Sequence, residues 1–418
     1  MDTPKESFAD FSHLLKAAKR AARSHKKKPY VQRFNFYLER ELVGLQRELN
    51  TQTYQPRPLK PFVLMEPKRR EIHSSHFRDR VVHHAICAHL EPKFEARFIG
   101  QSYACRKGRG QIQGVLDFYR QIRRIPSELR QNFTIVKADV KSYFASINHR
   151  TLFALISPHV EGPVMGQTIL KIITAHNGSH QTGLPIGNLT SQLYANLYLN
   201  ELDHYIKQKN LPYYFRYMDD FIVICDRRYH QQAQVLADIV DFLHTRLQLK
   251  LNPKKLFCKD LQRGMEFLGY HASPRGILIK PKNLARLKRK LSKRHAALCE
   301  GLIPIDRYIL SLVSWRGILT HSHASAQKIN LVLWAVKKFG AGSAYLIWYY
   351  FLWTLKNPPL AIRRLRSVLK DDHTAYRLWL ESHGLNASET VTFPASSPIV
   401  LDGQGDLRCP PPRPLPSP

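Results

Sequence analysis

Cysteine is scarce in this sequence and is never paired at short spacing. The 418 residues include six cysteines, none of them in a CxxC pair: Cys87, Cys105, Cys225, Cys258, Cys299 and Cys409. This spacing excludes a zinc knuckle and a disulfide framework. Scattered single thiols are typical of a reducing compartment, so we expect a cytoplasmic protein. The N-terminal residues lack an apolar core, and no secretory signal is expected.

Long apolar runs are also missing. The most apolar late segment, residues 344–355, has 12 residues, whereas a transmembrane helix needs about 20. We therefore expect a core helix there, and no membrane partner.

Acidic residues are few compared with basic ones. The 64 Lys and Arg against 32 Asp and Glu give a formal charge of +32. Such a surface attracts polyanions and favours a nucleic-acid partner. A solvated basic face or a surface for acidic lipid is the alternative. The hydrophobic content of 44% indicates a globular chain, and the length allows two or three domains.

Strand and helix patterns follow one another irregularly, without the repeating βα order of a doubly wound sheet. This order predicts an α+β fold. The strands are expected at residues 62–65, 132–139, 213–217 and 221–225, and the helices at residues 34–50, 77–98, 189–207 and throughout most of the chain beyond 280.

Three aspartates stand where apolar strands end. Asp139 closes one strand, and Asp219 and Asp220 form the corner of a hairpin. Carboxylates so placed are costly to bury unless a cation pairs with them. Mg²⁺ prefers such hard oxygen ligands and takes one or two carboxylates besides phosphates and water. The pattern predicts a metal site, with an exposed polar turn as the alternative.

The same segments resemble the catalytic motifs of reverse transcriptases. FRYMDDFIVI resembles their YxDD motif, and KADVKSYFASINH their first catalytic motif. Further blocks at residues 66–86, 98–110, 183–203, 249–255 and 265–273 resemble the family in the same order. The resemblance covers about residues 30–330 and is to bacterial group II intron- and retron-like enzymes, which implies a bacterial or phage-encoded protein.

This resemblance implies a right-hand polymerase fold. The expected parts are a basic N-terminal segment (1–30), fingers with an N-terminal helix (31–135), a palm with the catalytic motifs (136–275), a helical thumb with C-terminal helices (276–385), and a disordered Pro-rich tail (386–418).

It also implies an RNA-directed DNA polymerase that works with two Mg²⁺ ions, for which Mn²⁺ is an expected substitute. Asp139 and Asp219 would bind the metal, the Val140 carbonyl would assist, and Asp220 would complete the acidic cluster. The partners would be dNTPs, a template RNA and the RNA–DNA duplex.

Further roles carried by the resemblance concern the nucleotide. Lys68 and Arg70 would hold the triphosphate, which suits the point charge of Lys and the bidentate fork of Arg. An exposed basic turn is the alternative. Tyr143 would be the steric gate against a ribose 2′-hydroxyl, with a core aromatic as the alternative.

Other residues would contact the template, the primer or the leaving group. The template residues are Arg106, Lys107 and Arg109, and Tyr270 would position the primer end. Either Lys254 or Lys255 would protonate the leaving pyrophosphate; the spacing does not choose between them.

The pocket motif departs from the common pattern. Group II intron enzymes usually have QGxxxSP, whereas this chain has Ile186 and Gly187 at the start and Gln192 at the end, giving IGxxxSQ. Replacing the polar Gln with Ile would loosen base discrimination by about 1–3 kcal/mol.

The IGxxxSQ pattern resembles reverse transcriptases of diversity-generating retroelements, which copy a template RNA with errors at adenines and work with a small basic accessory protein. The alternatives are a group II-like enzyme with a neutral packing change, an antiphage-defence reverse transcriptase, and an RNA-binding maturase or scaffold with a vestigial site.

Overall fold

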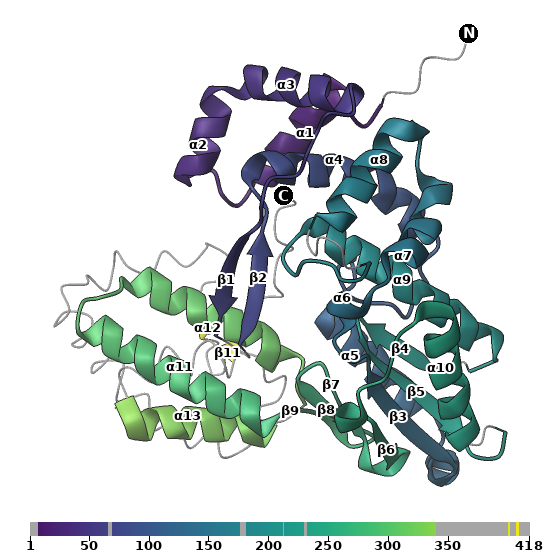
Figure 1. Cartoon of the computed structure of the whole chain (residues 1–418). Coiled ribbons are helices and arrows are strands. Elements are labelled where there is room, and N and C mark those ends of the chain that lie inside the picture. The colour runs from purple at the N-terminus through teal and green to yellow at the C-terminus, as the bar shows by residue number, and fades with distance from the viewer. Residues whose placement is uncertain are drawn as a thin grey trace. The chain divides into compact units, whose positions relative to one another are not determined.

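The computed structural model describes residues 7–65, 69–175, 181–211, 213–229, 232–323 and 325–339, and the short strands β10 (Val400–Leu401) and β11 (Leu407–Arg408) (Figure 1). Lys68 and the expected core helix at 344–355 lie outside the described residues, as does the expected Pro-rich tail apart from β10 and β11. The chain forms two compact units, divided between Arg275 and Gly276.

The predicted α+β class is confirmed, with antiparallel sheets at its centre. The first unit holds a four-stranded sheet in the order β4-β5-β3-β6. Its strands are β3 (Phe133–Asp139), β4 (Tyr214–Tyr217), β5 (Asp220–Asp226) and β6 (Phe257–Asp260). Strand β3 is almost wholly buried, including its polar residues Thr134 and Asp139. It pairs with β5 on one side and β6 on the other.

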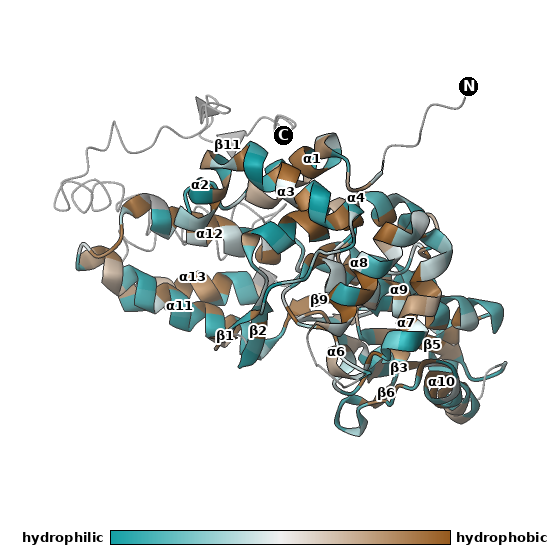
Figure 2. Ribbon diagram, turned by 45° about the horizontal axis from the view of Figure 1, so that its top comes forward, coloured by the Kyte–Doolittle hydropathy of each residue, from teal (hydrophilic) through white to brown (hydrophobic). Residues whose placement is uncertain are grey.

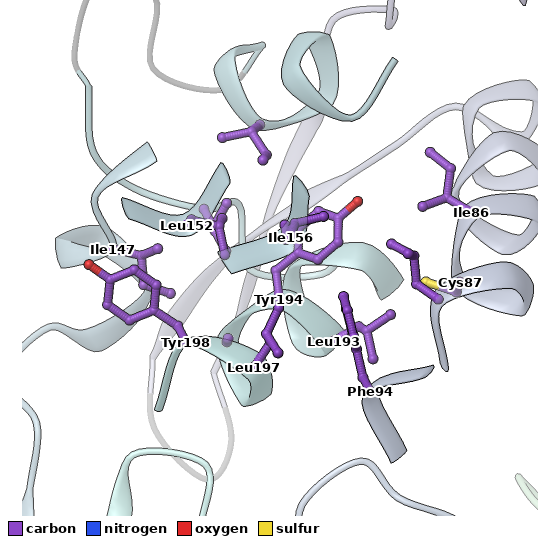
Figure 3. Close-up of a cluster of buried hydrophobic side chains, with 14 of the residues drawn as sticks. Ile86, Cys87, Phe94, Ile147, Leu152, Ile156, Leu193, Tyr194, Leu197 and Tyr198 are labelled. Atoms are coloured by element: carbon purple, nitrogen blue, oxygen red, sulfur yellow. The ribbon is translucent and has the colours of Figure 1, made fainter. Parts of the chain in front are cut away.

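Buried helices complete the core of this unit. Helix α9 (Leu189–Gln208) contacts α4 (Phe77–Glu95), α7 (His149–Ile156) and α10 (Gln232–Leu247). Figure 3 shows the apolar cluster that joins α9 to α4 and α7, including Leu193, Tyr194, Cys87 and Leu152. Most residues of α9 are buried, including several polar ones, because the helix is enclosed by neighbours on several sides.

The N-terminal residues of the described chain are helical. Within the expected basic segment, helix α1 (Phe11–Ala22) packs on α4 and buries Leu14 and several alanines. The helix expected over residues 34–50 is broken at Tyr37 into α2 (Pro29–Phe36) and α3 (Leu38–Asn50). The hydropathy colouring of Figure 2 shows both hydrophobic and hydrophilic residues along α1, α2 and α3.

The remaining elements of the first unit surround this core. Strands β1 (Lys60–Leu64) and β2 (Arg70–Ser74) form an antiparallel hairpin. Strands β7 (Met265–Phe267) and β8 (Tyr270–Ser273) form another, contacted by α5 (Gln111–Arg124). The other helices are α6 (Tyr143–Ser146) and α8 (Gly162–Thr174).

The second unit is mainly helical. Strand β9 (Gly276–Ile279) leads into α11 (Pro281–Cys299), α12 (Ile305–Thr320) and α13 (Ser325–Phe339). Two hydrogen bonds join β9 to the residues after α12. The Ile277 N–H donates to His323 Nδ1 at 3.2 Å, and the His323 N–H donates to the Ile277 carbonyl at 2.9 Å. Within the described ranges, no helix combines the length and apolar character that a bilayer crossing requires.

Candidate active site

Strand register brings the three aspartates together. In the antiparallel β3–β5 pair, Asp139 stands directly opposite Asp220. The Val140 N–H donates to the Asp219 carbonyl at 3.2 Å, which closes the end of the ladder. Two segments far apart in the sequence thus place their carboxylates at one edge of the sheet, as the strand-end positions predicted.

The turn that carries Asp219 is held in an uncommon backbone conformation. Met218 has φ of +56°, in the left-handed region that non-glycine residues rarely adopt. The guanidinium of Arg216 donates from Nη1 to the Met218 carbonyl at 3.1 Å. Arg216 is itself fully buried and donates from Nε and Nη2 to the two carboxylate oxygens of Asp203, each at 2.6 Å. A buried ion pair therefore supports the turn that carries Asp219 from within the core.

The surroundings of Asp219 and Asp220 disfavour the charged form of their carboxyl groups. Burial, followed by the negative charge of Asp139, raises the pKa of Asp219 to about 6. Burial also raises the pKa of Asp220, although the ammonium of Lys137 acts in the opposite direction. Bringing like charges into a sheltered edge is unfavourable unless cations join them.

Two lysines approach the cluster. Lys255 Nζ lies 2.5 Å from Asp139 Oδ2, and Lys137 Nζ lies 3.1 Å from Asp220 Oδ2. The segment that carries Lys255 is fixed because the Asn252 N–H donates to the Asp139 carbonyl at 2.8 Å. Lys254 is exposed, and its backbone N–H donates to the Asn252 side chain. Of the two lysines left open by the sequence, Lys255 is the one at the aspartates.

The donor set fits a hard divalent cation. Oδ1 of Asp220 is buried and makes no hydrogen bond to the described residues. The oxygens of Asp139, Asp219 and the Val140 carbonyl are the ligand type that Mg²⁺ prefers. Over the described ranges, no three His, Cys, Asp or Glu side chains are arranged as a ready cage for a metal. A magnesium site that phosphate and water complete needs only one or two carboxylates from the protein.

The pocket motif lies against the β1–β2 hairpin. The Ile186 carbonyl accepts from the His73 N–H at 2.8 Å. Gly187 has φ of +127°, and a Cβ there would lie 2.8 Å from Ile72 Cγ2 and 3.0 Å from the His73 carbonyl oxygen. Glycine is thus required both by its conformation and by the approach of β2. The Ile186 side chain is 36% exposed.

Other predicted nucleotide residues take different positions. Arg70 is exposed at the start of β2, while Gln192 is half-buried near the start of α9 and accepts from the Cys105 thiol at 3.5 Å. The Tyr143 side chain is 2% exposed, and its hydroxyl donates to the Ala195 carbonyl at 2.5 Å. Burial raises its pKa well above the usual value. These contacts fit the alternative of a core aromatic better than a steric gate.

Two predicted template or primer residues are also turned inward. The Arg106 guanidinium donates to Glu95 at 2.6 Å and to the carbonyls of Ile99 and Ser102, and its side chain is 5% exposed. It therefore anchors its own loop, whereas Lys107 and Arg109 are exposed. Tyr270 is buried in β8, and burial raises its pKa to about 12.

Sequence reasoning missed three charged residues around the site: Lys137, Asp203 and Arg216. Lys137 and Arg216 each lie in a strand of largely apolar residues, and a charged residue in such a place needs a buried partner, whereas Asp203 lies in a helix of mixed composition. That signal was present in the sequence, but it does not identify the partner.

Comparison with known proteins assigns the class. Residues 65–272 match the family described as reverse transcriptase (RNA-dependent DNA polymerase). These residues therefore form a reverse transcriptase domain, and enzymes of this family generally use divalent metal ions such as Mg²⁺.

The particular relatives are proteins of low identity. Protein YkfC of Escherichia coli (strain K12) is 25% identical over 270 residues, which cover 55% of this chain and 70% of YkfC. Group II intron-encoded protein LtrA of Lactococcus lactis subsp. cremoris is 23% identical over 349 residues, which cover 66% of this chain and 56% of LtrA. The chain thus spans little more than half of LtrA.

Among solved structures, apo telomerase from Candida tropicalis is 12% identical in sequence with a TM-score of 0.45. The match covers 71% of this chain and 59% of the telomerase chain. The same telomerase with a fragment of telomeric RNA has a TM-score of 0.41, with 12% identity and coverage of 61% and 52%.

Proposed function

We propose that this chain copies a template RNA into cDNA at Asp139 and Asp219, within a diversity-generating retroelement. The observation that carries the polymerase proposal is the meeting of Asp139 with Asp219 and Asp220 at one sheet edge, next to two lysines. Such carboxylates, held on rigid neighbouring strands, suit nucleotidyl transfer with two metal ions.

In the proposed reaction, Asp139, Asp219 and the Val140 carbonyl would hold the Mg²⁺ ions, which would supply Lewis-acid chemistry. The pairing of Asp139 with Asp220 and the hydrogen bond from the Val140 N–H to the Asp219 carbonyl fix the backbones of Asp139 and Asp219 relative to each other, so little rearrangement is needed for binding. Lys255 Nζ is the group placed to give a proton to the leaving pyrophosphate, since it already lies at Asp139. The half-exposed side chain of Lys255 leaves it free to move when metal arrives.

The substrate contacts are proposed from the fingers and palm positions. Arg70, together with Lys68 outside the described residues, would hold the triphosphate. Lys107 and Arg109 are exposed and suit template phosphates, whose binding depends on basic side chains. Tyr270 is buried, so it would position the primer end through its neighbours.

The retroelement subtype rests on the IGxxxSQ motif. Ile186 carries no side-chain hydrogen-bonding group and lies half-exposed where the pocket loop meets β2. A pocket without a polar restraint there supports error-prone copying. The proposed partners are a template RNA and a small basic accessory protein, and the proposed compartment is the cytoplasm of a bacterium.

A group II-like enzyme or maturase is the second candidate, and the similarity to LtrA favours it. Primer extension on a defined RNA with dNTPs and Mg²⁺, followed by sequencing of the cDNA, separates the candidates. Errors concentrated opposite template adenines support the retroelement proposal. Accurate copying favours the group II-like enzyme, and RNA binding without synthesis favours a scaffold.

A further inference from the structure

Lys137 and Lys255 contact the aspartates in different ways. Lys255 is 43% exposed and reaches Asp139 from a short 3₁₀ turn, η3 (Pro253–Lys255). Lys137 is only 15% exposed and arises from the middle of strand β3. Lys255 is therefore the more accessible of the two side chains, whereas Lys137 is largely enclosed at the sheet.

Strand geometry directs Lys137 toward Asp220. Lys137 is two residues before Asp139, so both side chains project from the same face of β3. Asp139 is paired with Asp220 across the ladder, which makes Lys137 the diagonal neighbour of Asp220. The ion pair of 3.1 Å between Nζ and Oδ2 follows from this register.

A second contact fixes the ammonium. Lys137 Nζ also donates to the backbone carbonyl of Glu266 in strand β7 at 2.9 Å. It lies 5.9 Å from the centre of the Phe267 ring, within reach of a cation–π interaction. The lysine is thus held by a carboxylate, a backbone oxygen and an aromatic face, all within the first unit.

We propose that Lys137 is a positioning residue that stays paired with Asp220 when metal binds, so that Asp220 Oδ2 is withheld from the metal. Asp139 and Asp219 then serve as the metal-binding carboxylates. The proposal deepens the proposed function, because it assigns unequal roles to the three aspartates.

The test compares Lys137→Met with Lys137→Arg in the full-length chain. Methionine keeps the stem against Phe267 but removes the charge, whereas arginine keeps the charge. The matched control is Lys259→Met: Lys259 is exposed on β6, opposite Ile135 and on the same face of the sheet. Mn²⁺ binding is measured by the electron paramagnetic resonance signal of free Mn²⁺, without nucleotide or RNA. Primer extension gives kcat and the KM for dNTP.

Lys137→Met is expected to bind Mn²⁺ about fivefold more tightly, because a competing positive charge has left and Oδ2 is released. Its kcat should fall by about 10- to 100-fold, because Asp220 loses the partner that holds it in place beside the two metal-binding aspartates. The KM for dNTP should not change. Lys137→Arg should retain the wild-type Mn²⁺ affinity and recover much of the kcat, and Lys259→Met should resemble the wild type in both.

Unchanged or weaker Mn²⁺ binding in Lys137→Met overturns the proposal, since it means that Lys137 does not compete with metal at Asp220. The Mn²⁺ measurement does not depend on polymerase activity. A wild-type protein that makes no DNA therefore contradicts the proposed function, while the Mn²⁺ shift still decides the role of Lys137.

Discussion

Arg216 and Asp203 form an ion pair in which both side chains are completely buried, with 2.6 Å between Nη2 and Oδ2. The same guanidinium holds the Met218 carbonyl in the turn before Asp219 and Asp220. Removal of one partner of a buried pair leaves the other charge without compensation.

Arg216→Met should therefore lower the free energy of unfolding by about 3–5 kcal/mol, measured by urea denaturation. The matched control is Arg228→Met, which breaks the surface pair of Arg228 with Asp226 and should have little effect. The double variant Arg216→Met/Asp203→Leu should recover part of the loss, because no unpaired charge remains. Equal effects of the Arg216 and Arg228 variants would contradict this role of the buried pair.

Gly187 tests whether strand β2 approaches the pocket loop closely. Gly187→Ala should destabilise the protein by about 1–3 kcal/mol, because alanine is strained at φ of +127° and its Cβ would meet Ile72 and His73 of the β1–β2 hairpin. Gly44→Ala, in the interior of helix α3 with no atom close to its new Cβ, should stabilise by about 0.5–1 kcal/mol. Thermal melts of both variants check the opposite signs, and a stable Gly187→Ala protein would show that β2 does not approach this loop.

Asp219 makes stability depend on pH and on metal. Burial and the charge of Asp139 raise its pKa from 3.8 to about 6. The folded protein therefore binds this proton more tightly than the unfolded chain, and stability without divalent cations should fall as pH rises from about 4 to about 6. At pH 7.5 without metal, Asp219→Asn should melt at a higher temperature than the wild type.

Added Mg²⁺ should remove that difference by stabilising only the wild type. Asp238 provides the opposite control, because the Gln234 amide and Lys209 lower the pKa of its carboxyl. Asp238→Asn should not melt above the wild type under any of these conditions. An Asp219→Asn protein less stable than the wild type at pH 7.5 would mean that the aspartate is already satisfied without a cation.

Ile186 is expected to affect how often the wrong base is incorporated. Ile186→Gln should lower misincorporation opposite template adenine, because a polar side chain restores a hydrogen-bonding restraint in the pocket. Sequencing of cDNA from one RNA template, with Leu278→Gln as a control at another exposed apolar position, measures the effect. An unchanged error spectrum would remove Ile186 from the explanation of fidelity.

Strand patterns were enough to predict the central geometry. The apolar runs before Asp139 and on both sides of Asp219 and Asp220 predicted β3, β4 and β5, and strand-end positions predicted that these side chains meet. The order of motifs predicted a reverse transcriptase domain, which the family match over residues 65–272 confirms. These features follow from local periodicity, which the sequence carries directly.

The directions of individual side chains could not be predicted in the same way. Ser142 adopts the left-handed conformation just before Tyr143, and the Tyr143 ring that follows is buried, with its hydroxyl at Ala195 in α9 rather than in an open pocket. Arg106 is drawn inward by Glu95, and Lys137 meets a carbonyl of β7. The direction of each of these side chains depends on contacts between residues distant in sequence, or on a left-handed backbone conformation that a serine in the sequence does not predict.

RNA-templated DNA synthesis by Asp219→Ala, measured beside RNA affinity, tests the central claim most directly. In the proposed function the carboxylate binds metal, whereas basic side chains elsewhere bind RNA, so we predict that primer extension with Mg²⁺ falls to background while RNA affinity and its salt dependence stay at the wild-type level. DNA synthesis that survives in the variant would contradict the assignment of this acidic cluster as the polymerase site.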